Sequence, residues 1–261
     1  MRRIQTIPAM LAAAALLVTT FAANAQTLQK SSSETRFQLD LKVNDAALKS
    51  FLPEGFTSNV SQQGAAKDCN LRLVFIDRVT INGPDGKPAG KGSNRLVYLV
   101  APVKDSTGAN AQLVVGGITE DPADAPGPFG NYLLADTHDM RRSSTDSAAG
   151  PILDTQDWVF IAKSGEHLEL HIKYERGTGN LGKANDQKFY SAKTPTFYQI
   201  SHQEQVLDIV RNGTTNPPDR VKEFTLKATG GSYDKLLDSS VKVLSWDNIL
   251  WVNRSVSTPT P

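Results

Sequence analysis

The segment 167–174 alternates polar and apolar residues, with Leu168, Leu170 and Ile172 on one face. A period of two is the spacing of a β-strand that buries one of its faces. Similar short segments, separated by turn-forming residues, recur at 37–43, 71–81, 95–103, 111–119, 132–136, 158–162, 196–200 and 221–228. We therefore expect a mainly β protein with a few short helices (α+β), built on a curved, largely antiparallel sheet or barrel.

Helical signals are few. Residues 46–52 carry the clearest one, with Asn44 or Asp45 as the N-cap and Pro53-Glu54-Gly55 as the stop. A short polar side chain before the first turn satisfies free backbone N–H groups, and proline with glycine ends a helix. One short helix is therefore expected directly after the first strand.

Four further segments are less distinct. The segment 203–211 fits a strand or a helix, and the following Asn212-Gly213 favours the helix. The segment 138–147 has room for one or two helical turns, and 235–251 combines a helical turn with a last strand. Residues 27–33 are polar and are expected to be a frayed chain end.

The first 25 residues have the parts of a signal peptide. Arg2 and Arg3 precede an apolar run at 9–21, and Ala23-Asn24-Ala25 forms a cleavage site before Gln26. Neither this run nor any later segment reaches the roughly 18 apolar residues that a spanning helix needs. We expect residues 1–25 to be removed and residues 26–261 to form a single exported, soluble domain, periplasmic or secreted, without membrane insertion and of the Gram-negative type.

Charge and cysteine usage narrow the classes of partner. Without Arg2 and Arg3, the chain carries 26 basic against 27 acidic residues. This balance, without a basic block, argues against nucleic acid as a partner. Cys69 is the only cysteine, so no intramolecular disulfide can form.

One candidate ligand site is the polar cluster of His138, Arg141 and Arg142, next to Asp139. An arginine fork suits bidentate binding of a carboxylate or a phosphate. The alternative is an exposed loop with a local ion pair. We rank this cluster first in a search for an anionic ligand.

A second candidate lies on the polar face of 167–174, where Glu169 and His171 alternate with the apolar residues. His167 and His171 are about 13 Å apart along a strand, too far to share one metal ion, and HLELH is not the helical HExxH motif. This face is either solvated or lines a cavity, and only the second case makes Glu169 and His171 ligand contacts or acid–base groups. The chain has no G-x-S-x-G elbow and no phosphate-binding or dinucleotide pattern, so we expect no metal and no cofactor.

Three stretches resemble one known family. FQLDLKVNDAALKSFLPEGF at 37–56 looks like a strand, a short helix and an "LLPEGL"-type stop; 165–179 is similar to a "G-x-L-x-x-x-x-x-R-x-G" strand; and 228–244 is similar to a C-terminal "G-x-x-x-L-x-x-S" region. In these three stretches the chain resembles the acetoacetate decarboxylase-like superfamily. The resemblance implies a cone-shaped, mostly antiparallel β barrel around a central cavity.

The resemblance also implies a catalytic lysine that this chain lacks. The family's enzymes form a Schiff base between a β-keto acid and a lysine in a "G-x-P-K" setting. The stretch taken to correspond here is 138–154, which contains Gly150-Pro151, but no lysine occurs between Lys104 and Lys163. Arginine cannot replace it, because guanidinium stays protonated.

Three functions remain open from the sequence. The leading hypothesis is a non-catalytic exported protein that binds a small apolar or carboxylated molecule in a barrel cavity. The second is an enzyme acting on a keto acid or a related small molecule, as a lyase or an acid–base hydrolase. The third is a structural or interaction module of the cell envelope, which predicts a filled barrel. The oligomeric state is not indicated by the sequence.

Overall fold

The computed structural model describes residues 26–146, 148, 150–212, 219–231 and 233–259. The expected signal peptide at 1–25 lies outside the described residues. The first half of the chain contains β1 (Gln26–Lys42), α1 (Asp45–Lys49), β2 (Thr57–Ser58), β3 (Leu71–Asn82), β4 (Asn94–Lys104), β5 (Asn110–Thr119), the 3-10 turn η1 (Pro122–Asp124) and β6 (Tyr132–Thr145). The second half contains β7 (Leu153–Ala162), β8 (His167–Glu175), β9 (Asn180–Leu181), β10 (Asn185–Ser191), β11 (Tyr198–Asn212), β12 (Val221–Thr229), α2 (Tyr233–Leu236) and β13 (Lys242–Pro259).

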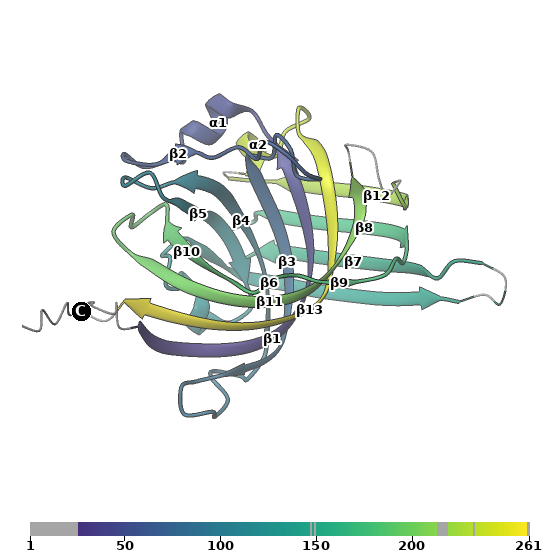
Figure 1. Cartoon of the computed structure of the whole chain (residues 1–261), viewed down its shortest axis with the longest axis horizontal. Coiled ribbons are helices and arrows are strands. Elements are labelled where there is room, and N and C mark those ends of the chain that lie inside the picture. The colour runs from purple at the N-terminus through teal and green to yellow at the C-terminus, as the bar shows by residue number, and fades with distance from the viewer. Residues whose placement is uncertain (1–25, 147, 149, 213–218, 232, 260–261) are drawn as a thin grey trace, which may run out of the picture.

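Seven of the described strands close into a barrel in the order β5-β10-β11-β13-β1-β3-β4 and back to β5. All neighbours in the barrel are antiparallel except β10 and β5, which are parallel. The antiparallel strands β6, β7, β8 and β12 form a second layer beside the barrel, joined to it by the parallel pair β5–β6 (Figure 1). The expected mainly β architecture with a barrel is confirmed.

The period-two alternation of the strands arises because the barrel wall lies between two different environments. On β1, Phe37, Leu39 and Leu41 are fully buried and belong to the core shared with the second layer. The alternate residues Arg36 and Asp40 are also buried, on the opposite face. The apolar face of β1 is therefore outside the barrel wall, and the polar face lines its interior.

The second layer covers that apolar outer wall. Trp158 and Phe160 of β7 lie 5.8 Å and 6.2 Å from Phe75 of β3, measured between ring centroids. Tyr174 of β8 packs on Phe37 in the same way, at 5.8 Å. Burying one side chain of this size contributes roughly 1.5–3 kcal/mol, so the interface between barrel and second layer is the main hydrophobic core.

A glycine allows the second layer to join the barrel. A Cβ on Gly117 of β5 would lie 2.7 Å from the carbonyl oxygen of Val97 and 2.8 Å from the ring of Tyr132. Gly117 pairs with Tyr132, the first residue of β6. Only glycine leaves room for this close approach, which places the Tyr132 ring inside the barrel.

Helix α1 follows the expected capping chemistry. The Asn44 side chain accepts hydrogen bonds from the backbone N–H groups of Ala46 and Ala47, at 2.9 Å and 3.2 Å. The helix ends at Lys49, earlier than the expected Leu52. Among the described residues, no helix has the length and apolar character needed to cross a membrane.

Three sequence-based assignments are corrected by strand pairing. Residues 27–33 are not frayed, because they extend β1 and pair with β13. Residues 138–145 belong to β6, paired with β7, and residues 203–211 belong to β11, between β10 and β13. Pairing with the sequence-distant β13 decides the conformation of 27–33 and 203–211, and pairing within the β6–β7 hairpin decides that of 138–145. Local propensity does not report either kind of pairing.

Candidate functional site

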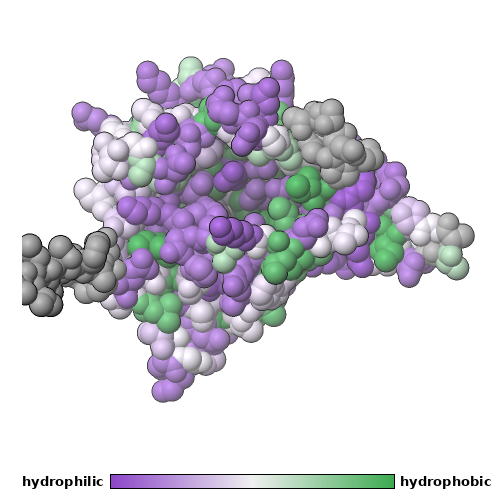
Figure 2. All heavy atoms as spheres, viewed as in Figure 1, coloured by the Kyte–Doolittle hydropathy of each residue, from purple (hydrophilic) through white to green (hydrophobic). Residues whose placement is uncertain are grey.

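The barrel encloses a polar chamber of about 170 Å³. Its lining consists of two arginines, five glutamines, two aromatic residues and one valine: Arg36, Arg72, Gln38, Gln112, Gln187, Gln203, Gln205, Tyr98, Phe189 and Val100. The chamber adjoins a wider mouth of about 530 Å³, since Arg72, Gln112 and Gln187 line both. The mouth lies between residues 59–63 and the start of β10, and Figure 2 shows a hollow edged by hydrophilic residues in this region.

Carboxylates inside the wall hold the two arginines of the chamber. Arg36 Nε donates to Glu34 Oε2 at 2.7 Å, and its Nη1 donates to Gln203 Oε1 at 3.0 Å. Arg72 Nε donates to Asp40 Oδ1 at 3.0 Å, while its Nη1 is 3.5 Å from Gln112 Oε1. Each guanidinium has five N–H donors, so Arg72 retains donors for a ligand.

A carboxyl pair lies next to the chamber inside the barrel. Gln38 Nε2 donates to both Asp40 Oδ1 and Asp247 Oδ2, at 3.1 Å and 3.3 Å. Burial, together with the neighbouring Asp40 carboxylate, raises the pKa of Asp247 well above its usual value. Asp247 therefore keeps its proton to a higher pH than an ordinary aspartic acid, and Gln38 and Arg72 connect the pair to the chamber.

Comparison with known proteins identifies the fold. No protein-family model matches the sequence, and no curated protein matches it. An acetoacetate decarboxylase-like enzyme from Sphingomonas wittichii RW1 matches the structure with a TM-score of 0.54 and 11% identity, over 96% of this chain and 100% of that chain. The enduracididine biosynthesis enzyme MppR, complexed with the condensation product of pyruvate and imidazole 4-carboxaldehyde, matches with a TM-score of 0.52 and 12% identity, over 91% of this chain and 90% of that chain. A structure of acetoacetate decarboxylase matches with a TM-score of 0.50 and 9% identity, over 88% of this chain and 87% of that chain.

The chain has the acetoacetate decarboxylase-like fold. At 9–12% identity the likeness establishes the fold alone. It confirms the resemblance read from 37–56, 165–179 and 228–244.

Within this acetoacetate decarboxylase-like fold, the stretch 138–154 lies away from the chamber. It forms the end of the β6–β7 hairpin, which extends away from the barrel at the right of Figure 1. The sequence analysis took 138–154, with Gly150-Pro151, to correspond to the segment that carries the family's lysine. The position of this stretch on the hairpin corrects that assignment. None of the described residues lining the chamber itself is a lysine, and Lys188 is the lysine that lines the adjoining mouth.

The first predicted ligand cluster is also on this hairpin. Arg141 and Arg142 are exposed on β6, and His138 Nδ1 lies 2.9 Å from Glu120 Oε2. β6 leaves the barrel after its first residues, so these side chains do not reach the chamber. His138, Arg141 and Arg142, expected to bind a carboxylate, line neither the chamber nor its mouth.

The second predicted cluster lies on the outer face of β8. His171 Nδ1 is 2.6 Å from Asp157 Oδ1 and its Nε2 is 3.4 Å from Glu223 Oε2, while Glu169 pairs with His167 at 3.2 Å. The hydrogen bond to Asp157 raises the pKa of His171. The apolar residues of β8 take the inner face, so Glu169 and His171 form a solvated ion-pair surface, and the cavity-lining alternative does not apply.

Sequence reasoning missed the residues that do line the chamber. Arg36 and Gln38 alternate with the apolar Phe37 and Leu39 on β1, and this alternation is visible in the sequence. The polar face of this strand was assigned to solvent, whereas here the barrel encloses it. Gln203 and Gln205 on β11 are separated by Glu204, so no alternation of polar and apolar residues marks them.

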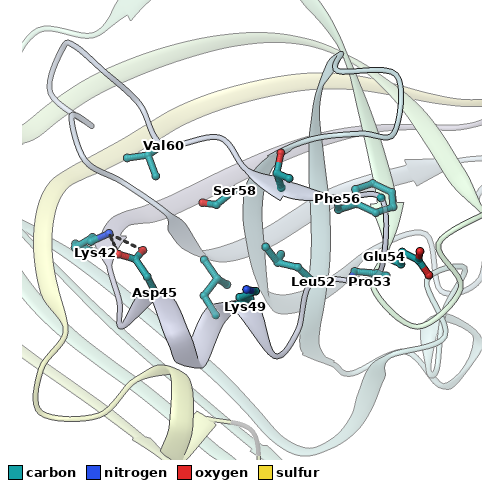
Figure 3. A pocket seen from close by; sticks show the side chains of 12 residues that line it. Lys42, Asp45, Lys49, Leu52, Pro53, Glu54, Phe56, Ser58 and Val60 are labelled. Atoms are coloured by element: carbon teal, nitrogen blue, oxygen red, sulfur yellow. Dashed lines mark hydrogen bonds and ion pairs between the residues drawn. The ribbon is translucent and has the colours of Figure 1, made fainter.

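A second, apolar pocket of about 600 Å³ lies outside the barrel between α1 and β2 (Figure 3). Leu48, Leu52, Pro53, Phe56 and Val60 contribute its apolar side chains. At one side, Lys42 Nζ is 2.7 Å from Asp45 Oδ1. This surface pocket has no buried polar group to orient a ligand, so the barrel chamber is the stronger candidate site.

Proposed function

We propose that this protein is an exported binding protein that holds a small carboxylated molecule in the barrel chamber without Schiff-base chemistry. One observation carries the proposal: a chamber lined by two buried or half-buried arginines and five glutamines adjoins an open mouth. Such a lining offers many hydrogen-bond donors and little apolar surface. This lining favours a carboxylated ligand over an apolar one. A chamber that is open to solvent fits a binding protein better than a structural module, for which a filled barrel is expected.

The chamber chemistry supports a carboxylate as the recognised group. Guanidinium donors match carboxylate oxygens, and hydrogen bonds between charged groups are stronger than neutral ones. Glutamine amides can both donate and accept, so they suit the remaining polar groups of a small molecule. The solved MppR complex contains a product built from pyruvate, which makes keto acids the first class to test.

The enzyme alternative keeps one specific support. Asp247, whose pKa is raised by burial and by the neighbouring Asp40, accepts a hydrogen bond from Gln38 of the chamber lining. A buried carboxyl group with a raised pKa is typical of acid–base sites. In that case the chamber ligand is a substrate, and turnover accompanies binding.

Titration calorimetry with a panel of short keto acids and other small carboxylates tests the proposal. Binding is expected for the mature chain and for Lys163→Gln, which removes a positive charge from an exposed turn. Arg72→Gln is expected to weaken binding by about 10- to 100-fold, since a charged hydrogen bond contributes roughly 1.5–3 kcal/mol.

Two further measurements make the result decisive. Gln187→Leu changes the chamber without breaking an ion pair, so it tests the same site if Arg72→Gln does not fold. Borohydride with a keto acid should leave no covalent mass on the protein. Labelling of a lysine, or equal affinity for the chamber variants and Lys163→Gln, would overturn the proposal.

A further inference from the structure

A second, much smaller cavity lies deeper in the barrel. Its volume is about 20 Å³, and Tyr98 and Phe189 line both this cavity and the chamber, so their rings mark the boundary. Arg78, Arg254 and Tyr132 also line the lower cavity. A space of this size holds one water molecule or one monatomic ion.

The ion pairs around this cavity contain more positive than negative charge. Glu34 is fully buried; its carboxylate is 3.0 Å from Arg254 Nε, 3.9 Å from Arg78 Nε and within hydrogen-bonding distance of Arg36. Asp124 pairs with Arg78 at 3.0 Å and with Lys30 at 3.5 Å. We call these six side chains the barrel floor: four cations and two carboxylates, an excess of two positive charges.

One guanidinium donor of the barrel floor has no close acceptor among the described residues. Arg78 Nε is buried without a hydrogen-bond partner and lies 3.9 Å from Glu34 Oε1, whereas Arg254 Nε lies 3.0 Å from the same oxygen. Both arginines line the lower cavity. An unpaired donor of a buried cation is costly, so an acceptor with negative charge is favoured there.

The charge excess also acts on the neighbouring lysine. Burial and the Arg78 guanidinium, with a smaller effect from Arg254, lower the pKa of Lys30 to about 8, against the opposing effect of Asp124. Burial likewise lowers the pKa of Arg254, with Arg78 and Arg36 adding to it. In both cases burial is the largest cause, and the neighbouring guanidinium groups add to it against the effect of the paired carboxylate.

We propose that the lower cavity binds one small inorganic monoanion of the size of chloride, held by Arg78 and Arg254 beneath the Tyr98–Phe189 boundary. The cavity is too small for an organic carboxylate with its carbon skeleton. One anion reduces the floor's excess charge by half and accepts a hydrogen bond from the unpaired Arg78 Nε. This site is separate from the chamber, so the proposal stands whether or not the chamber binds a keto acid.

Thermal unfolding of the mature chain in sodium chloride, sodium bromide and sodium methanesulfonate at equal ionic strength tests the site in solution. Methanesulfonate is too large for the lower cavity and is not a carboxylate. Halide binding to the folded state alone raises Tm, by roughly 3–6 °C at a tenfold excess of halide over Kd, and the rise continues with the logarithm of the halide concentration. Equal Tm values in halide and methanesulfonate would overturn the proposal.

Two lysine variants provide a matched pair. Lys30→Gln removes one floor cation without touching Glu34, and is expected to weaken halide affinity about tenfold or more. Lys163→Gln removes an exposed charge and should retain the full halide response. A halide response that Lys30→Gln retains in full would place the anion elsewhere and contradict the assignment.

Anomalous diffraction from crystals grown in bromide locates the ion directly. A bromide peak between the Arg78 and Arg254 guanidinium groups is the expected result. Bromide peaks confined to the surface, with only water density in the lower cavity, would overturn it.

Discussion

At the scale of single residues, the barrel interior keeps ionisable groups in unusual states. Asp247 is nearly sealed from solvent beside Asp40, and both accept hydrogen bonds from Gln38. A buried carboxyl next to a carboxylate retains its proton, because ionisation would add a second negative charge in the same space. This has a measurable effect on the pH dependence of stability.

The folded pKa of Asp247 lies above its unfolded value, so the folded protein holds a proton that the unfolded chain releases. The free energy of unfolding therefore decreases as pH rises from about 4 towards the folded pKa, by up to about 1.4 kcal/mol per pH unit. Asp247→Asn cannot ionise and should escape this decrease. Its stability relative to the wild type should increase as pH rises from about 4 towards the folded pKa and show no gain below about pH 3.

Urea unfolding across this pH range checks the expectation. Asp136→Asn is the control, because Asp136 is exposed on β6. A difference between Asp247→Asn and wild type that stays constant with pH would show that Asp247 is ionised in the folded state.

At the scale of elements, the inner and outer faces of β8 should respond very differently to substitution. Leu170 is fully buried against the barrel, whereas Glu169 pairs only with His167 on the outer face. Leu170→Ala should lower the free energy of unfolding by about 2–5 kcal/mol, and Glu169→Ala by no more than about 0.5 kcal/mol. Denaturant unfolding of the two variants measures this, and similar losses would mean that the face assignment is reversed.

The sequence predicted most strands, helix α1 and the barrel, because alternation and capping are local signals. It failed for 203–211 and 27–33, where pairing with β13 decides the conformation. It also failed for the site. Arg36 and Gln38 alternate with apolar residues as Glu169 and His171 do, and only closure of the barrel makes one polar face internal and leaves the other exposed.

At the scale of the whole molecule, the barrel has polar residues inside and its main apolar core outside. The second layer covers the outer wall, which leaves the interior free for charged and amide side chains. The interior then divides at Tyr98 and Phe189 into a ligand-sized chamber and an ion-sized cavity. A protein with this plan is suited to hold a small polar molecule away from bulk water.

Native mass spectrometry of the purified protein, followed by denaturation and identification of released molecules, tests the central claim most directly. We predict a small carboxylated ligand that is released on denaturation and is absent from Arg72→Gln but present in Lys163→Gln. A protein that stays bare when small carboxylates are added would contradict the account. A mass increment that survives denaturation would contradict it too, since it would mean covalent chemistry at a lysine.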